Sequence, residues 1–249
     1  MNYEELEEQR RLMWSKSLGP KGGNYLRYND SPLNIKVSYC VTVYNRSLLK
    51  GREYLPRLVE TLREDSPAES ELIVTDWQST DLPLLNWLPQ AWDKSLQIIE
   101  MDGKFSAAWG RTTACERANG NFVFALDADM LVPKGYTKTI IGYLKGGYKT
   151  AFPLYYIEES DGVISPSPEQ VANFKKNNDP ANRGHGNYAF PKTLWPKLRM
   201  AYGDSLTRTS WGGEDHEIFW VSCALGDCWR DWIPGFIHQW HSKEGSFYG

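Results

Sequence analysis

Two carboxylate clusters, far apart in the chain, carry the residue types best suited to chemistry. The first, Asp127-Ala128-Asp129, follows the apolar run 122–126, which predicts a buried strand. Open α/β sheets bind their ligands at the carboxyl ends of parallel strands. Oxygen ligands at positions i and i+2 suit a divalent cation that carries a phosphate group. This cluster therefore predicts a site for a metal ion and a phosphate.

The second cluster, Trp211-Gly212-Gly213-Glu214-Asp215, adds groups that suit a sugar. The indole offers a flat face for stacking, the two glycines let a ligand approach the backbone, and a carboxylate can act as a base. Acidic residues are also typical of a helix N-terminus, where they complement the dipole, and both interpretations can hold together. The two clusters together indicate glycosyl transfer from a nucleotide-sugar.

The elements expected to position these clusters alternate along the chain. Strands are predicted at 35–44, 71–75, 96–100, 122–126 and 148–154. Helices are predicted from an N-cap at Ser47 to about Arg63, from Ser106 to a left-handed stop at Gly120, and over 134–144. This order predicts an α/β fold with a mostly parallel central sheet flanked by helices.

The chain is predicted to form a single domain, 35–249, with an N-terminal helical appendage, 1–34. Within the domain we expect a nucleotide-binding half over 35–130 and an acceptor-binding half over 131–249. The polar segment 158–186, rich in Pro, Asn and Gly, lies between the two acidic clusters. Long loops of this kind are often functional, so we interpret it as a substrate-gating loop.

Composition narrows the class of protein. The formal net charge is −3, with acidic and basic residues interspersed, so the basic stripe expected of a nucleic-acid-binding protein is missing. The aromatic content of 14% suits a sugar site or an aromatic-rich core. No apolar run is long enough to span a membrane, and the N-terminus is charged, unlike a signal peptide. We expect a cytoplasmic protein, which could still act peripherally on a membrane-borne acceptor.

The four cysteines show no metal-binding spacing. Buried free thiols in a reducing compartment are the expected state. A Cys223–Cys228 bridge is the alternative if the protein is exported.

Four segments, in order, resemble those of the GT-A-fold inverting glycosyltransferases, over about residues 35–245. The strand end 42–46 resembles their nucleotide-binding start, and 127–129 resembles the D-x-D motif. The turn 76–81, Asp-Trp-Gln-Ser-Thr-Asp, is similar to the D-x-x-S-x-D turn of the family that includes chondroitin polymerases. The segment 211–219 is similar to the W-G-G-E-D segment of the β-1,4-galactosyltransferases and their N-acetylgalactosaminyl relatives. The resemblance implies a GT-A (Rossmann-like) fold.

The resemblance also implies a metal site. Asp129 would be its first ligand, while Asp127 would contact the ribose or a metal-bound water. In β-1,4-galactosyltransferases a Met and a His three residues apart complete the site, and this chain has His238 and His241 instead. Such ligands suit Mn²⁺, and Zn²⁺, Co²⁺ or Mg²⁺ stay open as alternatives. Either imidazole could instead belong to the core or face solvent.

The nucleotide-sugar would bind mainly in the first half of the domain. Asp76 could accept the imide N–H of uracil or cap a turn, and Arg111 could pair with Asp127 or steady the donor diphosphate. The residues implied to bind the nucleotide-sugar are Thr42, Tyr44, Asn45, Arg46, Asp76, Arg111, Asp127, Ala128, Trp211 and Gly213.

Catalysis is assigned to Asp215 as the general base, with Glu214 bonded to a sugar. Direct displacement at the anomeric carbon inverts it and needs a group to take the proton of the acceptor hydroxyl. His185 and Asn187 are predicted acceptor contacts.

The predicted protein is a metal-dependent inverting glycosyltransferase. It would move a hexose or N-acetylhexosamine, with galactose or N-acetylgalactosamine favoured, from a UDP-sugar to a hydroxyl of a glycan acceptor. One alternative is a nucleotidyl or phosphoryl transferase, although no Walker loop is present. Another is a non-catalytic carbohydrate-binding protein.

Overall fold

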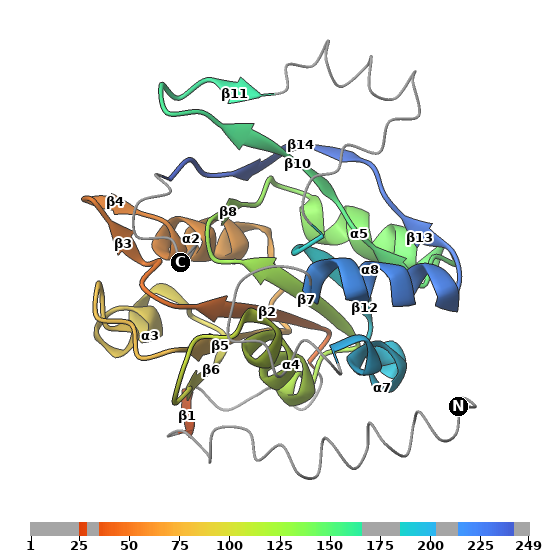
Figure 1. Cartoon of the computed structure of the whole chain (residues 1–249), viewed down its shortest axis with the longest axis horizontal. Coiled ribbons are helices and arrows are strands. Elements are labelled where there is room, and N and C mark those ends of the chain that lie inside the picture. Colours follow the sequence, from red (N-terminus) through yellow and green to blue (C-terminus); the bar gives the residue numbers. More distant parts are fainter. Residues whose placement is uncertain (1–24, 29–34, 166–184, 203–213, 242–249) are drawn as a thin grey trace.

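The computed structural model describes residues 25–28, 35–165, 185–202 and 214–241, which build an α/β fold around an eight-stranded sheet (Figure 1). The strand order is β1-β6-β5-β2-β7-β12-β9-β13. Strands β6, β5, β2 and β7 run parallel, and β12 is antiparallel to both of its neighbours. The strand bounds are β1 Tyr25–Tyr28, β2 Val37–Val43, β5 Ser70–Asp76, β6 Ser95–Glu100, β7 Phe122–Asp127, β9 Thr150–Ala151, β12 Tyr188–Pro191 and β13 Cys228–Trp229.

Helices cover both faces of this sheet because its central strands are apolar on both sides. Val41 of β2 packs in one core cluster with helices α2 and α5, whereas its neighbour Cys40 packs in the other with α4, α7 and α8. Alternate side chains of a strand point to opposite faces, so burial of consecutive residues requires two covering layers. The helix bounds are α2 Leu55–Asp65, α3 Leu88–Ala91, α4 Ala107–Arg117, α5 Tyr136–Lys145, α7 Trp195–Leu198 and α8 Glu214–Leu225, with short 3₁₀ turns at Leu84–Asn86, Lys192–Leu194 and Arg199–Tyr202.

A smaller sheet lies beside the carboxyl ends of the central strands, in the order β11-β10-β14-β8 (Figure 1). Strand β8 begins directly after Asp129, and the antiparallel β14 places His238 opposite Met130. Strand β14, which comes late in the chain, is therefore held next to the end of β7. The bounds are β8 Met130–Leu131, β10 Leu154–Glu158, β11 Ile164–Ser165 and β14 Trp232–His238, with a separate hairpin of β3 Leu48–Leu49 and β4 Arg52–Glu53.

The predicted fold class is confirmed: a mostly parallel central sheet is flanked by helices. The predicted helix start at Ser106 also holds, since the Ser106 hydroxyl accepts from the backbone N–H of Trp109 at 3.3 Å. Part of the predicted appendage, Tyr25–Tyr28, pairs with β6 as an edge strand. The rest of the predicted helical appendage, 1–34, and most of the predicted gating loop lie outside the described residues.

Three local predictions were wrong. The helix expected from Ser47 begins only at Leu55, because Lys50 and Gly51 both adopt positive φ and turn the chain into the β3–β4 hairpin. Gly120 is not a left-handed stop: a Cβ there would lie 2.7 Å from the backbone nitrogen of Ser38, so it permits close packing on β2. The strand expected over 148–154 is divided into β9 and β10.

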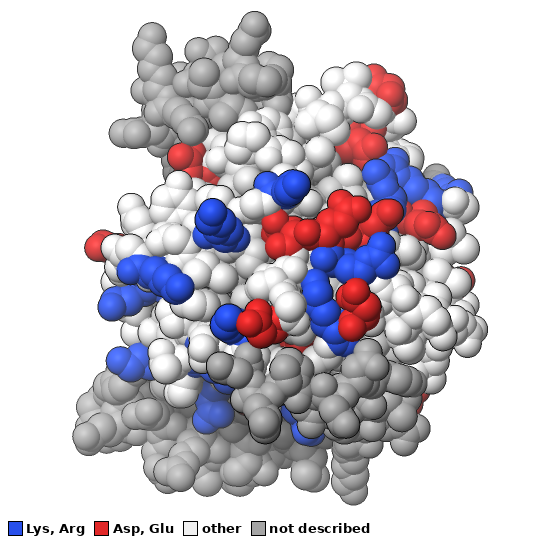
Figure 2. Space-filling model, turned by 180° about the vertical axis from the view of Figure 1, so that it is seen from behind, with Lys and Arg blue, Asp and Glu red and all other residues white. Residues whose placement is uncertain are grey.

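The surface agrees with the mixed charge of the sequence. Figure 2 shows basic and acidic side chains interspersed on the face opposite to that of Figure 1. Among the described residues, no helix is both long and apolar enough to cross a membrane. All four cysteines are free, with Cys40 and Cys115 buried and Cys223 exposed.

Candidate active site

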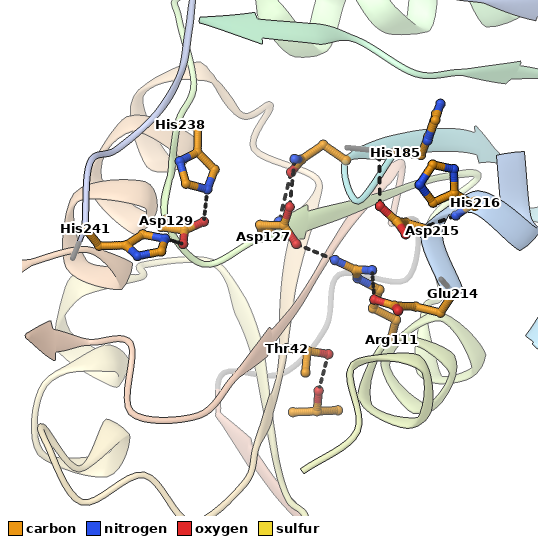
Figure 3. Close-up of polar contacts among 12 residues, drawn as sticks. Thr42, Arg111, Asp127, Asp129, His185, Glu214, Asp215, His216, His238 and His241 are labelled. Atoms are coloured by element: carbon orange, nitrogen blue, oxygen red, sulfur yellow. Dashed lines mark hydrogen bonds and ion pairs between the residues drawn. The ribbon is translucent and has the colours of Figure 1, made fainter. Parts of the chain in front are cut away.

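Asp129 and two late histidines meet at the end of β7, and we call them the first His–Asp cluster. The Nε2 atom of His238 lies 3.6 Å from Asp129 Oδ1, and Nε2 of His241 lies 3.3 Å from Asp129 Oδ2 (Figure 3). The pairing of β14 with β8 brings them there, and the backbone N–H of Gln239 donates to the carbonyl of Asp129 at 2.8 Å. The three side chains present one oxygen ligand and two nitrogen ligands to a common point.

Side chains that the sequence did not single out fix these imidazoles. Gln239, between the two histidines, is fully buried and accepts from the Arg57 guanidinium at 2.7 Å. The ring of His238 stacks on Tyr155 with centroids 5.6 Å apart, and the ring of His241 meets Tyr54 edge-on. A glutamine placed between two potential metal-binding histidines is the sequence signal from which the role of Gln239 could have been predicted.

The electrostatic setting of Asp129 favours its charged form. Burial alone would raise the pKa of Asp129, but the imidazoles of His238 and His241 and the Arg46 guanidinium hold it below its usual range. A buried carboxylate facing two imidazoles is a donor set that a divalent transition metal such as Mn²⁺ or Zn²⁺ accepts. The residues present therefore fit the metal ion that the fold family implies.

A pocket opens beside this cluster at the carboxyl ends of β2 and β7. It is lined by predicted nucleotide-sugar residues together with Phe105 and Ala107, which the sequence analysis did not name. Phe105 stacks on Tyr44 with centroids 5.8 Å apart, so one wall is aromatic. An aromatic residue directly before the N-cap Ser106 was the available signal. The predicted residues that line the pocket are Thr42, Tyr44, Arg46, Arg111, Asp127, Ala128 and Asp129.

Asn45 and Asp76, also predicted to bind the nucleotide, make turn contacts. The Asp76 carboxylate accepts from the backbone N–H of Ser79 at 3.0 Å, and burial raises its pKa. The side-chain oxygen of Asn45 accepts from the backbone N–H of Thr80 at 2.8 Å. Asn45 therefore holds the loop after β2 against the turn after β5, and Asp76 caps that turn, which matches the turn-cap alternative for Asp76.

Arg111 joins the two acidic clusters. Its guanidinium forms an ion pair with Asp127 and a second with Glu214, at 3.0 Å, and its side chain is only 4% exposed (Figure 3). Of the two alternatives for Arg111, the pairing with Asp127 is observed. Glu214, expected to contact a sugar, is itself buried against Arg111. Burial raises the pKa of Glu214 although Arg111 opposes the shift, so the bridge offsets only part of the desolvation cost.

The tripeptide His185-Gly186-Asn187 contacts both acidic clusters, through Asp127 and Asp215. The Asn187 amide clamps Asp127, donating to its carboxylate and accepting from its backbone N–H, both at 2.9 Å. A Cβ on Gly186 would lie 2.6 Å from the carboxylate of Asp127, so a larger residue there would displace that carboxylate. The backbone N–H of His185 donates to Asp215 at 3.1 Å. Asn187, predicted to contact the acceptor, orients the carboxylate of Asp127.

Asp215 lies in the first turn of α8 with an imidazole on either side, and we call His185, Asp215 and His216 the second His–Asp cluster (Figure 3). Its carboxylate oxygens accept from the backbone N–H groups of His185 and His216, at 3.1 and 3.0 Å. Within the described residues, neither imidazole forms an ion pair with it. Burial, with a smaller contribution from Arg230, lowers the pKa of His185 to about 4. Trp211 and Gly213, two other predicted donor contacts, lie outside the described residues.

The chain is similar to known proteins in sequence family and in fold. Residues 38–202 match the glycosyl transferase family 2. No curated protein matches the chain.

Two solved structures share the fold. A crystal structure of GalNAc-T7 with UDP, GalNAc and Mn²⁺ aligns with a TM-score of 0.62 at 18% identity, covering 84% of this chain and 44% of that chain. A crystal structure of S. aureus TarS in complex with UDP-GlcNAc aligns with a TM-score of 0.60 at 16% identity, covering 86% of this chain and 62% of that chain. The chain thus spans less than two thirds of either relative, and at these identities the likeness concerns the fold alone.

Proposed function

The chain belongs to glycosyl transferase family 2, and we propose that it is a metal-dependent inverting enzyme that uses a UDP-sugar. The observation that carries this proposal is the first His–Asp cluster, which lies beside a pocket at the carboxyl ends of the parallel strands. Open α/β sheets bind nucleotides at this edge. The pocket is lined entirely by residues of 35–130, which supports that segment as the nucleotide-binding half and 131–249 as the acceptor half.

Asp129, His238 and His241 would hold the cation, Mn²⁺ being favoured. When bound, this ion would supply positive charge to the departing diphosphate. Arg46, at the pocket wall near Asp129, would add a guanidinium to the same negative charge. Asp127 is held by Arg111 and Asn187, so its remaining accepting capacity would position a ribose hydroxyl or a metal-bound water.

The donor would lie along Thr42 and the aromatic wall of Tyr44 and Phe105. We propose a hexose or N-acetylhexosamine as the transferred sugar, with galactose or N-acetylgalactosamine favoured. The fold relatives support a UDP-linked sugar of this class, since one was solved with UDP and GalNAc and another with UDP-GlcNAc. The acceptor would be a hydroxyl of a glycan.

Asp215 would be the base. Its two backbone hydrogen bonds orient the carboxylate, and no arginine contact holds it among the described residues, unlike Glu214. As the acceptor oxygen bonds to the anomeric carbon, its proton would pass to Asp215, and the bond from that carbon to the diphosphate would break. Glu214 would then act through Arg111 as a positioning residue.

A panel of UDP-sugars tests this function. Purified protein with Mn²⁺ should be stabilised in thermal unfolding by UDP and by its own donor, because a ligand of the native state raises stability by mass action. That donor should release UDP in the presence of a glycan acceptor. Stabilisation by no UDP-sugar, or release of pyrophosphate in place of UDP, would contradict the proposal.

A further inference from the structure

All four histidines of the chain lie in the two His–Asp clusters, two in each. In each cluster one ligand atom from every residue lies within 4.8 Å of the others. The proposed function uses the imidazoles of the first cluster and only the carboxylate of the second. His185 and His216 are therefore chemically competent groups without a role in the proposed reaction.

The second cluster contains an observation that points to a ligand. His185 is only 6% exposed, and its Nδ1 atom is buried without a hydrogen-bond partner among the described residues. An unpartnered buried nitrogen costs free energy, and a bound cation is one way to satisfy its lone pair. The His185 ring faces that of His216, with centroids 4.8 Å apart, and stacks on Phe219 at 4.2 Å. Phe219 fixes the buried imidazole beside the exposed one.

The cluster has the ligand types and spacing of a transition-metal site. Bonds of about 2.0–2.2 Å to nitrogen and oxygen place tetrahedral ligands about 3.4 Å apart. The observed ligand atoms lie within 4.8 Å of one another, and the His216 side chain is exposed, so binding would require the ligands to draw closer. Two imidazoles with one carboxylate suit Zn²⁺ and related ions better than Mg²⁺ or Ca²⁺.

We propose that His185, Asp215 and His216 form a second cation site that binds a transition metal such as Zn²⁺, and that the bound ion blocks the carboxylate assigned as the base. The blocking rests on the proposed function, whereas the binding does not. Arg230, whose guanidinium lies 5.1 Å from the centroid of the Phe219 ring, adds positive charge nearby.

Zinc binding can be measured apart from activity. Metal-free protein carrying Asp129→Ala and His241→Ala, which dismantles the first cluster, is titrated with Zn²⁺ against a chromogenic chelator. We expect one site to remain, and adding His216→Ala should weaken it by more than about tenfold. Cys223→Ser, which removes an exposed thiol of the same helix, is the matched control and should leave it unchanged.

Absence of Zn²⁺ binding in the doubly substituted background would overturn the proposal. Binding that survives His216→Ala, or that Cys223→Ser abolishes, would also overturn it. Co²⁺ in the same background supplies a second readout, because its absorption spectrum distinguishes imidazole and carboxylate ligands from thiolate.

The blocking is tested with Mn²⁺ held at saturation. Zn²⁺ should slow the wild-type enzyme, and in His216→Ala the half-inhibiting concentration, relative to that variant's own zinc-free rate, should rise more than about tenfold. An unchanged value would overturn the blocking. No turnover of any UDP-sugar by the wild type would count against the proposed function and leave the zinc-binding result standing.

Discussion

The two His–Asp clusters contain the same types of side chain, one aspartate and two histidines, but arrange them differently. In the first, both imidazoles point at the Asp129 carboxylate, at 3.3 and 3.6 Å. In the second, the Asp215 carboxylate accepts backbone N–H groups, and its imidazoles lie beside it without an ion pair in the described chain. In the first cluster both imidazoles face the aspartate, which supports its proposed role as a metal ligand. In the second cluster backbone N–H groups orient the carboxylate, which supports its proposed role as a base that a bound cation would block.

Arg111 connects the two acidic pairs, Asp127 with Asp129 and Glu214 with Asp215, through Asp127 and Glu214. Each pair therefore has one acid that pairs with Arg111 and one, Asp129 or Asp215, that carries a proposed chemical role. This separation within each acidic pair is the physical basis for assigning different roles to adjacent carboxylates.

The largest expected effect comes from removing the second cluster's carboxylate. Asp215→Asn should lower the transfer rate about 10³-fold, because proton removal by a positioned base contributes roughly 10²–10⁴. Donor affinity, measured by titration calorimetry with Mn²⁺ present, should stay within about twofold, since the base acts on the acceptor hydroxyl. Asp227→Asn, an exposed acid just beyond α8, is the matched control. Normal transfer in Asp215→Asn, or a lowered rate that is explained by weakened donor binding, would refute the assignment.

Disrupting the first cluster should lower the transfer rate less, and, unlike Asp215→Asn, it should also weaken nucleotide binding. Asp129→Ala should lower the rate about 10²-fold at fixed Mn²⁺ and weaken UDP binding, because cationic stabilisation of a phosphoryl oxygen is worth several kcal/mol. Calorimetric titration of UDP with and without Mn²⁺ checks this. The wild type should bind UDP more tightly with the metal, and the variant should show no such gain. Asp93→Ala, an exposed acid, serves as the control, and equal metal dependence in all three proteins would count against the site.

Removing the bridge between the clusters should mainly affect stability. Arg111→Met removes the guanidinium that pairs with the buried Glu214 and the half-buried Asp127, which should lower the free energy of unfolding by about 3 kcal/mol. Urea denaturation measures this difference. Arg117→Met, at an exposed position of the same helix, should cost less than about 1 kcal/mol. If the two variants proved equally stable, Arg111 would not be the connection inferred here.

The smallest effect is a pH dependence of stability from His185. Its pKa of about 4 in the native protein lies below the ordinary value of 6.5, so the unfolded chain binds more protons between these values. Stability should therefore fall as pH drops from 7 to 5, with His185 contributing up to about 2 kcal/mol. Asp215, His216 and Arg230 are the charged groups that face it.

The check compares His185→Gln with the wild type by urea denaturation at pH 5 and pH 7 in a metal chelator. The substitution should remove this part of the pH dependence. Identical pH dependences in the two proteins would show that His185 is not held neutral by its surroundings.

Local patterns predicted most of the elements because their apolar periodicity is a property of short segments. The strand before Asp127 and the cap at Ser106 followed from neighbouring residues alone. Where a local signal was misjudged, as at Lys50-Gly51, a turn replaced the predicted helix. The sequence also showed the types of groups in the site: an acidic pair after a strand and two histidines three residues apart.

By itself the sequence determined which residues could do chemistry and which strand end would carry the first acids. Only the tertiary structure decided their partners: Arg111 meets Glu214 across 103 positions, and the backbone N–H of Gln239 donates to the carbonyl of Asp129. Such pairings depend on how the sheets align and on which apolar faces are buried together. Those are properties of the whole packed chain, and no short segment contains them.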